Sequence, residues 1–190
     1  MKALETDPVM AELVETHGPL ELEPADNEFE RLVVSIINQS VSTASATAVR
    51  ERVFAHLDEV TPEAVLATDE ATLREAGLGR SKTEYVRNAA TAFQERDLSR
   101  EGLDGMADDE VISELKRIRG VGEWTARMYL LFVLGREDVF PVGDLAVRRG
   151  VESLYADGED LSRAEIREIA ERWRPYRSLA TLYIWAHDES

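Results

Sequence analysis

Apolar residues recur along the chain at the spacing of one helix face, and no segment alternates as a half-buried strand does. The stretch 29–37 is the clearest example, and it follows a capping residue at Asp26 or Asn27. Further helices are predicted at about 43–57, 69–77, 81–96, 108–119, 124–134 and 144–155, with others beginning at 62, 162 and 175. The pattern therefore predicts an all-α protein of about nine or ten helices joined by short connections.

Several of these helix starts rest on local capping signals. Ser81 with Glu84, and Ser162 with Glu165, have the spacing of a capping box. Pro175 is suited to the first position of the last helix, because its missing N–H is not needed there. The segment 124–134 is apolar on nearly all sides but too short to span a bilayer, so it is expected to be a buried central helix.

The most informative turn is Gly120-Val121-Gly122, which lies between the predicted helices 108–119 and 124–134. Glycines permit a tight turn with exposed backbone N–H groups at the N-terminus of a helix, where the helix dipole favours an anion. The turn could therefore bind a phosphate through its backbone, without reading sequence. Alone, such a short motif is more often an ordinary helix–helix turn.

A second informative stretch is the Gly/Pro-containing loop 139–144, which ends at Asp144. Asp144 follows Gly143 and opens a helix, so its ordinary role would be that of a helix cap. A carboxylate at this place can also stabilise positive charge that develops on a sugar, and the helix N-terminus would help to keep it ionised.

From Leu115 to Gly150 the chain resembles the helix-hairpin-helix superfamily of DNA glycosylases, which is named for its hairpin, Gly/Pro-rich loop and Asp. The spacing of about twenty residues from hairpin to Asp144 is similar to that of the family. The stretches 37–42, 120–126, 138–141 and 173–180 resemble the DNA-3-methyladenine glycosylase II group. The resemblance covers about residues 25–187 and lacks the extra N-terminal sheet domain of some members.

The resemblance implies two helical lobes with a cleft between them, within a single glycosylase domain 1–190. The helix-hairpin-helix would cover about 108–134, with the Gly/Pro-Asp loop at 139–144. Such an enzyme flips its target base out of the duplex and cleaves the N-glycosidic bond. Asp144 matches the catalytic carboxylate of the family.

The family also implies roles for residues around the base and the DNA backbone. Trp124 and Trp185 match pocket aromatics, although core packing is the commoner role of Trp; Met128 replaces a pocket Tyr of relatives, and Tyr129 is next to it. The wedge that fills the gap left by the flipped base would lie at Gln39-Ser40, with Gln39 the better candidate because Ser is small. Further contacts to DNA are expected from the hairpin, Thr125, and the loop that carries Arg80 and Lys82.

Bifunctional relatives carry a Lys just after the hairpin, where this chain has Trp124, and no Lys follows Lys116. Strand cleavage through a Schiff base is therefore not expected. The chain has no cysteine, which excludes disulfides and iron–sulfur clusters, and its three histidines show no metal-ligand spacing. No cofactor or metal is expected, apart from a monovalent cation that the family implies at the hairpin carbonyls.

The charge is unusual for a DNA-binding protein, because 38 acidic residues face 22 basic ones and the net charge is −16. Phosphates would be repelled at low salt. Concentrated salt would screen this repulsion, so the composition favours adaptation to a salt-rich (halophilic) cytoplasm. The basic residues also gather locally, because residues 116–150 carry seven bases and four acids. The sequence shows no signal peptide or membrane span, which predicts a cytoplasmic protein.

The expected partner is double-stranded DNA with a damaged base, bound by a monomer and without a membrane. The predicted activity is hydrolytic removal of alkylated purines such as 3-methyladenine. Two alternatives stay open: a glycosylase for another damaged or mismatched base, and a non-catalytic helix-hairpin-helix module that only holds DNA. A pure binding module would have no need of Asp144 at the end of its loop.

Overall fold

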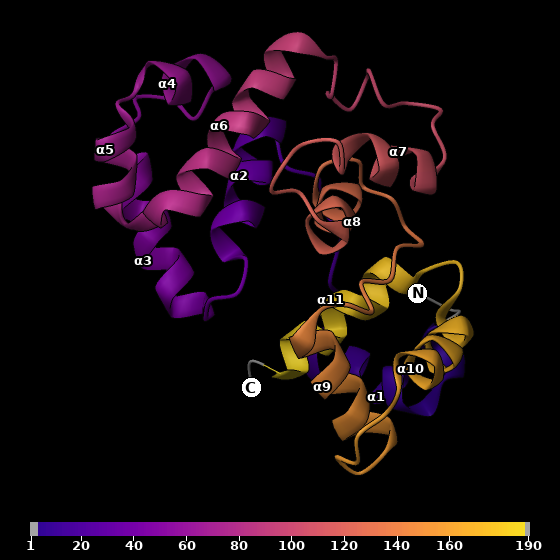
Figure 1. The fold of residues 1–190 in the computed structure, drawn as a ribbon. Coiled ribbons are helices and arrows are strands. Elements are labelled where there is room, and N and C mark those ends of the chain that lie inside the picture. Colours follow the sequence, from indigo (N-terminus) through magenta and orange to yellow (C-terminus); the bar gives the residue numbers. More distant parts are fainter. Residues whose placement is uncertain (1–3, 189–190) are drawn as a thin grey trace. The chain divides into compact units, whose positions relative to one another are not determined.

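The computed structural model describes residues 4–188, and every regular element within that range is a helix (Figure 1). These residues form two compact units. One unit comprises residues 1–24 and 130–190, and the other comprises residues 25–129. The all-α prediction and its division into two helical lobes are confirmed, and the cleft between the lobes stays a prediction. None of the helices in the described range is both long and apolar enough to cross a bilayer.

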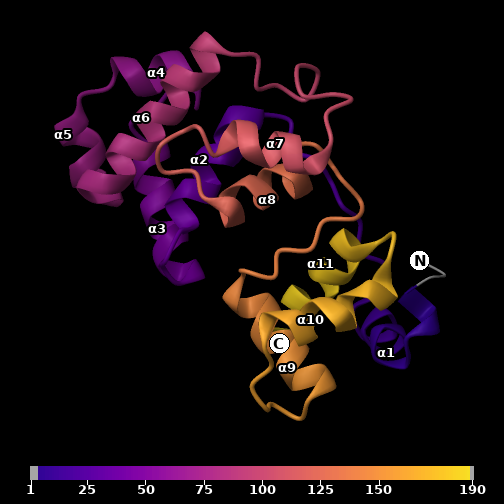
Figure 2. The same ribbon diagram turned by 45° about the vertical axis from the view of Figure 1, so that its right-hand side comes forward.

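The 25–129 unit is built around a long helix, α6 (Gly79–Glu95), which packs against α2 (Glu28–Asn38) and α4 (Pro62–Ala67) (Figure 2). The helix α3 (Thr43–Phe54) packs against α2. A short α5 (Glu70–Leu73) continues into the wider turn η2 (Arg74–Leu78), and α7 (Asp108–Leu115) and α8 (Glu123–Phe132) flank the hairpin.

Local capping explains where several of these helices begin. The side chain of Asn27 accepts a hydrogen bond from the Glu30 N–H, so Asn27 is the cap of α2 and Asp26 is not. Thr61 and Asp69 cap α4 and α5 in the same way, next to the predicted helix starts at 62 and 69.

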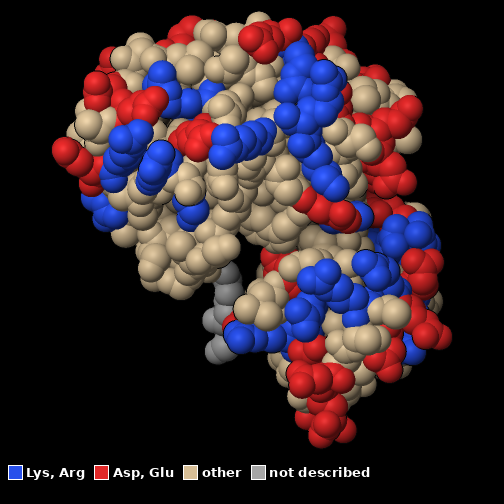
Figure 3. Space-filling view, in the orientation of Figure 1, with Lys and Arg blue, Asp and Glu red and all other residues tan. Residues whose placement is uncertain are grey.

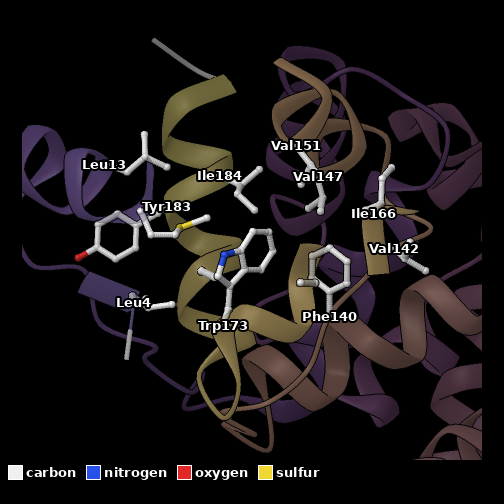
Figure 4. Close-up of a cluster of buried hydrophobic side chains, with 13 residues drawn as sticks. Leu4, Leu13, Phe140, Val142, Val147, Val151, Ile166, Trp173, Tyr183 and Ile184 are labelled. Atoms are coloured by element: carbon white, nitrogen blue, oxygen red, sulfur yellow. The ribbon is translucent and has the colours of Figure 1, made fainter. Parts of the chain in front are cut away.

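The other unit consists of a short turn η1 (Leu4–Thr6) and the helices α1 (Pro8–His17), α9 (Leu145–Tyr155), α10 (Arg163–Ala170) and α11 (Arg177–Asp188), with the short turn η3 (Glu171–Trp173) before α11. The helix α11 packs against both α1 and α9. Trp173 is fully buried in the core of this unit, where its ring meets Phe140 edge to face and lies next to Ile184 (Figure 4). Burial of these large apolar side chains fixes the loop 139–144 and α9 on α11.

Two predicted helix starts are wrong, and one helix was not predicted. Ser81 does not open a helix, because α6 already starts at Gly79, two residues earlier, after a kink in η2 at Gly77, whose φ is +113°. Pro175 does not start the last helix, because Arg177 is its first residue and Pro175 lies in the connection after η3. The pattern also missed α1, whose start is fixed by an Asp7 side chain that accepts hydrogen bonds from the Val9 and Met10 N–H groups.

Candidate active site

Asp144 stands at the N-terminus of α9, at the end of a loop that is held firmly in place. The Val139 N–H donates to the Ser178 hydroxyl at 2.9 Å, and that hydroxyl donates to the Arg136 carbonyl. The Asp144 N–H donates to the Pro141 carbonyl at 2.8 Å, which closes the turn. Because the loop residues 139–142 are buried, the backbone before Asp144 is anchored from both sides.

One oxygen of the Asp144 carboxylate receives two hydrogen bonds within this unit. Its Oδ1 accepts from the Val147 N–H at 3.0 Å and from Trp185 Nε1–H at 3.3 Å. The first bond is the helix cap that the sequence predicted, and the second comes from α11, 41 residues away. Because both donors act on Oδ1, capping and a second role of the partly exposed carboxylate are compatible.

The aromatic partner of Asp144 is itself part of a stacked pair. The rings of Trp185 and Phe132 are nearly parallel, with centroids 5.8 Å apart and planes 17° apart. Both side chains are half-buried, so neither is a pure core residue. The sequence identifies Trp185 as a pocket candidate but not Phe132, because nothing in its pattern shows that these two residues meet.

The hairpin 120–122 has the geometry of a tight turn between two helices. Gly120 has a φ of +102°, which disfavours a side chain, and a Cβ there would lie 2.1 Å from Cγ of Tyr85. Gly122 is exposed, and its carbonyl accepts the Ala126 N–H in the first turn of α8. Val121 is buried, so it can offer DNA its backbone and little of its side chain.

Gln39 joins the connection after α2 to this hairpin. Its Nε2 donates to the Gly120 carbonyl at 2.9 Å and to Thr125 Oγ1 at 2.8 Å. Thr125 is only 1% exposed, so the structure contradicts its expected direct contact with DNA. Gln39 is therefore a brace of the hairpin in this structure, and its assignment as the wedge stays a prediction.

The neighbouring positions on the connection after α2 are exposed. Ser40 has a φ of +56°, a left-handed conformation that non-glycine residues rarely adopt, and its side chain is small. The side chain of Val41 is 45% exposed. Among the described residues, the one other large hydrophobic side chain that is exposed is Leu145, directly after Asp144. An exposed apolar side chain beside a proposed DNA surface fits contact with bases.

Two residues assigned to the base pocket belong to the core instead. Met128 and Tyr129 are 3% and 1% exposed. The Tyr129 hydroxyl donates to the Leu98 carbonyl at 2.6 Å, its ring meets Phe93 edge to face, and burial raises its pKa. The helix α8 therefore buries these two residues, and Trp124, half-buried in its first turn, is the base-pocket candidate that it retains.

The two cations expected to contact DNA differ in their surroundings. Lys82 donates from Nζ to the Ile37 carbonyl at 2.6 Å, and burial lowers its pKa. It therefore satisfies a carbonyl at the C-terminal end of α2, and its contact with DNA stays a prediction. Arg80 is exposed on the first turn of α6. No group of three metal-ligating side chains occurs within residues 4–188.

A model of the HhH-GPD superfamily of base excision DNA repair proteins matches residues 33–175, which is most of the chain. The chain belongs to this superfamily. The match includes the connection after α2, the hairpin, and Asp144.

Relatives of this HhH-GPD protein are known from yeasts and bacteria. The alkylbase DNA glycosidase-like protein mag2 of Schizosaccharomyces pombe is 26% identical over 91% of this chain and 84% of its own length. The putative DNA-3-methyladenine glycosylase YfjP of Bacillus subtilis is 28% identical over 93% of this chain and 64% of its own length.

Solved structures share the fold over nearly the whole chain. The DNA-3-methyladenine glycosidase of Bacillus halodurans is 32% identical, with a TM-score of 0.81 over 99% of this chain and 88% of that one. The S. pombe 3-methyladenine DNA glycosylase Mag1, in complex with abasic DNA, is 25% identical, with a TM-score of 0.90 over 100% of this chain and 98% of that one.

Proposed function

We propose that this HhH-GPD protein is a monofunctional DNA glycosylase that removes alkylated purines, such as 3-methyladenine, from double-stranded DNA. The names of its relatives support the reaction class and the type of lesion. The observation that carries the proposal is Asp144, whose Oδ1 is held by the Val147 N–H and Trp185 Nε1–H beside an aromatic pair. We assign residues 1–190 to one glycosylase domain that acts as a cytoplasmic monomer.

Asp144 is the proposed catalytic residue. In the reaction the bond between the base nitrogen and the sugar C1′ breaks, and its electron pair leaves with the base. The positive charge that develops on the sugar is stabilised by the nearby carboxylate. Water then forms the new bond to C1′ and loses a proton to Asp144 or to solvent. The N-terminus of α9 favours the negative charge that this role needs.

The stacked pair of Trp185 and Phe132 is the proposed wall for the flipped base. An alkylated purine such as 3-methyladenine carries a positive charge before it leaves, and a cation is attracted to the face of an electron-rich ring. Such a base also departs without being protonated, so one carboxylate is enough. Trp124, Leu145 and the exposed Val41 are further candidates for contact with bases.

The chain's own residues support hydrolysis without strand cleavage. A Schiff base with the sugar needs an amine, and the position after the hairpin is Trp124, with no Lys beyond Lys116. The hairpin is the proposed backbone contact, because Gly122 is exposed at the start of the ten-residue α8. A monovalent cation at the hairpin carbonyls stays a prediction; the Gly120 carbonyl already accepts from Gln39.

The test is to incubate the wild-type protein, in concentrated salt, with methylated duplex DNA and to identify the released bases by chromatography. The proposal expects free methylpurines, abasic sites in unbroken strands, and no covalent adduct after borohydride treatment. Release of methylpurines with cleaved strands or a trapped adduct would contradict the monofunctional reaction. DNA binding without any release would favour another lesion or the non-catalytic module, and duplexes with single defined lesions separate these two.

A further inference from the structure

A hollow of about 490 Å³ lies on the 25–129 unit, next to the hairpin. Most of its lining is basic, and we call it the arginine groove. Its arginines are Arg74, Arg80, Arg87 and Arg119. The remaining lining comes from Glu70, Glu84 and Asn88. Figure 3 shows Lys and Arg side chains gathered over α5 and α6, in a protein whose net charge is −16. Such a local excess of positive charge calls for a function.

The α6 residues of the groove lie along one face of the helix. Arg80, Glu84 and Arg87 are spaced at i, i+4 and i+7, the pattern of a single helix face. From Arg80 to Arg87 the helix rises about 10 Å, which corresponds to the rise of about three base pairs along a duplex axis at 3.4 Å each. The groove is therefore long enough to contact more than one phosphate.

The groove holds its arginines in place without burying them. Arg87 donates to the carbonyls of residues 65, 66 and 68 near the end of α4, which fixes its side chain. Arg119 forms an ion pair with Glu84 at 2.6 Å, and its side chain is 75% exposed. Exposed pairs of this kind are weak, so a phosphate can replace the carboxylate as the partner of the guanidinium. Among the described residues, nothing is bonded to the side chain of Arg80.

The groove continues directly into the hairpin. Arg119 precedes Gly120, and its carbonyl accepts a hydrogen bond from Asn88 of α6 at 3.2 Å. The ring of Tyr85, on the same helix, lies against Gly120 so closely that a Cβ would not fit. The hairpin and the arginine groove therefore form one continuous surface within this unit.

We propose that the arginine groove binds the phosphodiester backbone of DNA as an extension of the hairpin site. The inference rests on the proposed function in that it takes duplex DNA to be the substrate. It assigns phosphate contacts to the more exposed arginines Arg74, Arg80 and Arg119, while Arg87 anchors this surface to the end of α4. Contacts of this kind hold any sequence equally, so they add affinity for undamaged and damaged DNA alike.

The test compares a groove variant, Arg80→Gln/Arg119→Gln, with a control variant, Arg163→Gln/Arg167→Gln. The control residues are exposed on α10 of the other unit. Each variant loses two positive charges, because each replaces two arginines with glutamine. Binding to a lesion-containing duplex and an undamaged duplex is measured by fluorescence anisotropy over a series of salt concentrations. The slope of log K against log salt should change by about 2 for the groove variant, because each phosphate contact contributes about 1. Its affinity at the lowest salt should fall about tenfold for both duplexes, with the control close to the wild type.

A groove variant with the slope and affinity of the control would overturn the proposal. Groove-dependent binding by a wild-type protein that releases no base would leave the groove standing and refute the proposed function. Base release by the wild type, together with unchanged DNA binding by the groove variant, would refute the groove and leave the proposed function standing.

Discussion

The brace between Gln39 and the hairpin gives the sharpest test of how this site is held. Replacement of Gln39 with Leu keeps the approximate size of the side chain and removes both hydrogen bonds, to the Gly120 carbonyl and to Thr125 Oγ1. A neutral hydrogen bond contributes about 1 kcal/mol net, and a buried group that loses its partner costs more. Thr125 is buried, so we expect Gln39→Leu to lower the free energy of unfolding by about 2–3 kcal/mol.

The matched control is Gln94→Leu. The side-chain amide of Gln94 donates to the Glu63 carboxylate at 3.0 Å on the exposed surface. Since water replaces an exposed partner, this change should cost less than about 0.5 kcal/mol. Both variants are measured by denaturant unfolding at one salt concentration, with the slope of the transition unchanged. The double variant Gln39→Leu/Thr125→Val should lose less than the sum of its single changes, because the two side chains share a bond. Equal stability of the Gln39 and Gln94 variants would refute the brace.

Two further predictions concern the hairpin and the core beneath it. Gly120→Ala should lower the free energy of unfolding by about 2–4 kcal/mol, because the φ of Gly120 is +102° and a Cβ there would meet Tyr85. Gly122 has open space around it, so Gly122→Ala should cost less than about 0.5 kcal/mol. Denaturant unfolding compares the two variants. Burial raises the pKa of Tyr129, so its contribution to stability is fully present below the unfolded pKa of about 10 and is lost as the pH rises above it. Tyr129→Phe should cost about 1–2 kcal/mol at neutral pH, from the lost bond to the Leu98 carbonyl, and should show a smaller loss of stability above pH 10 than the wild type; parallel alkaline profiles would contradict this.

The fold could be predicted from the sequence where local chemistry decides it. Asn27, Asp144 and the pair Ser162–Glu165 cap their helices as the pattern indicated, because a cap depends on residues within one turn. Ser81 has the same spacing to Glu84 but caps nothing, because α6 begins at Gly79 and Ser81 lies inside its first turn. The residues that do cap, Asn27, Asp144 and Ser162, are each in an extended conformation directly before their helix.

The candidate site was predictable only in part, because several of its contacts join residues far apart in the sequence. The resemblance led to Asp144, and its cap could be read locally. The bond from Trp185 to Asp144 spans 41 residues, and the bonds from Gln39 to the hairpin and to Thr125 span 81 and 86. Helical periodicity also could not distinguish Tyr129, which is in the core, from the half-buried Phe132 on the same helix.

Asp144 is the residue proposed to perform the chemistry, and single-turnover release of methylpurines measures its role without a contribution from product release. Asp144→Asn removes the charge and keeps a residue that caps a helix well, and Asp7→Asn makes the same change at the cap of α1 in the same unit. We expect Asp144→Asn to slow base release at least about 100-fold with DNA binding retained, and Asp7→Asn to release bases at a rate close to the wild type. Equal rates for the two variants would remove Asp144 from the centre of the reaction.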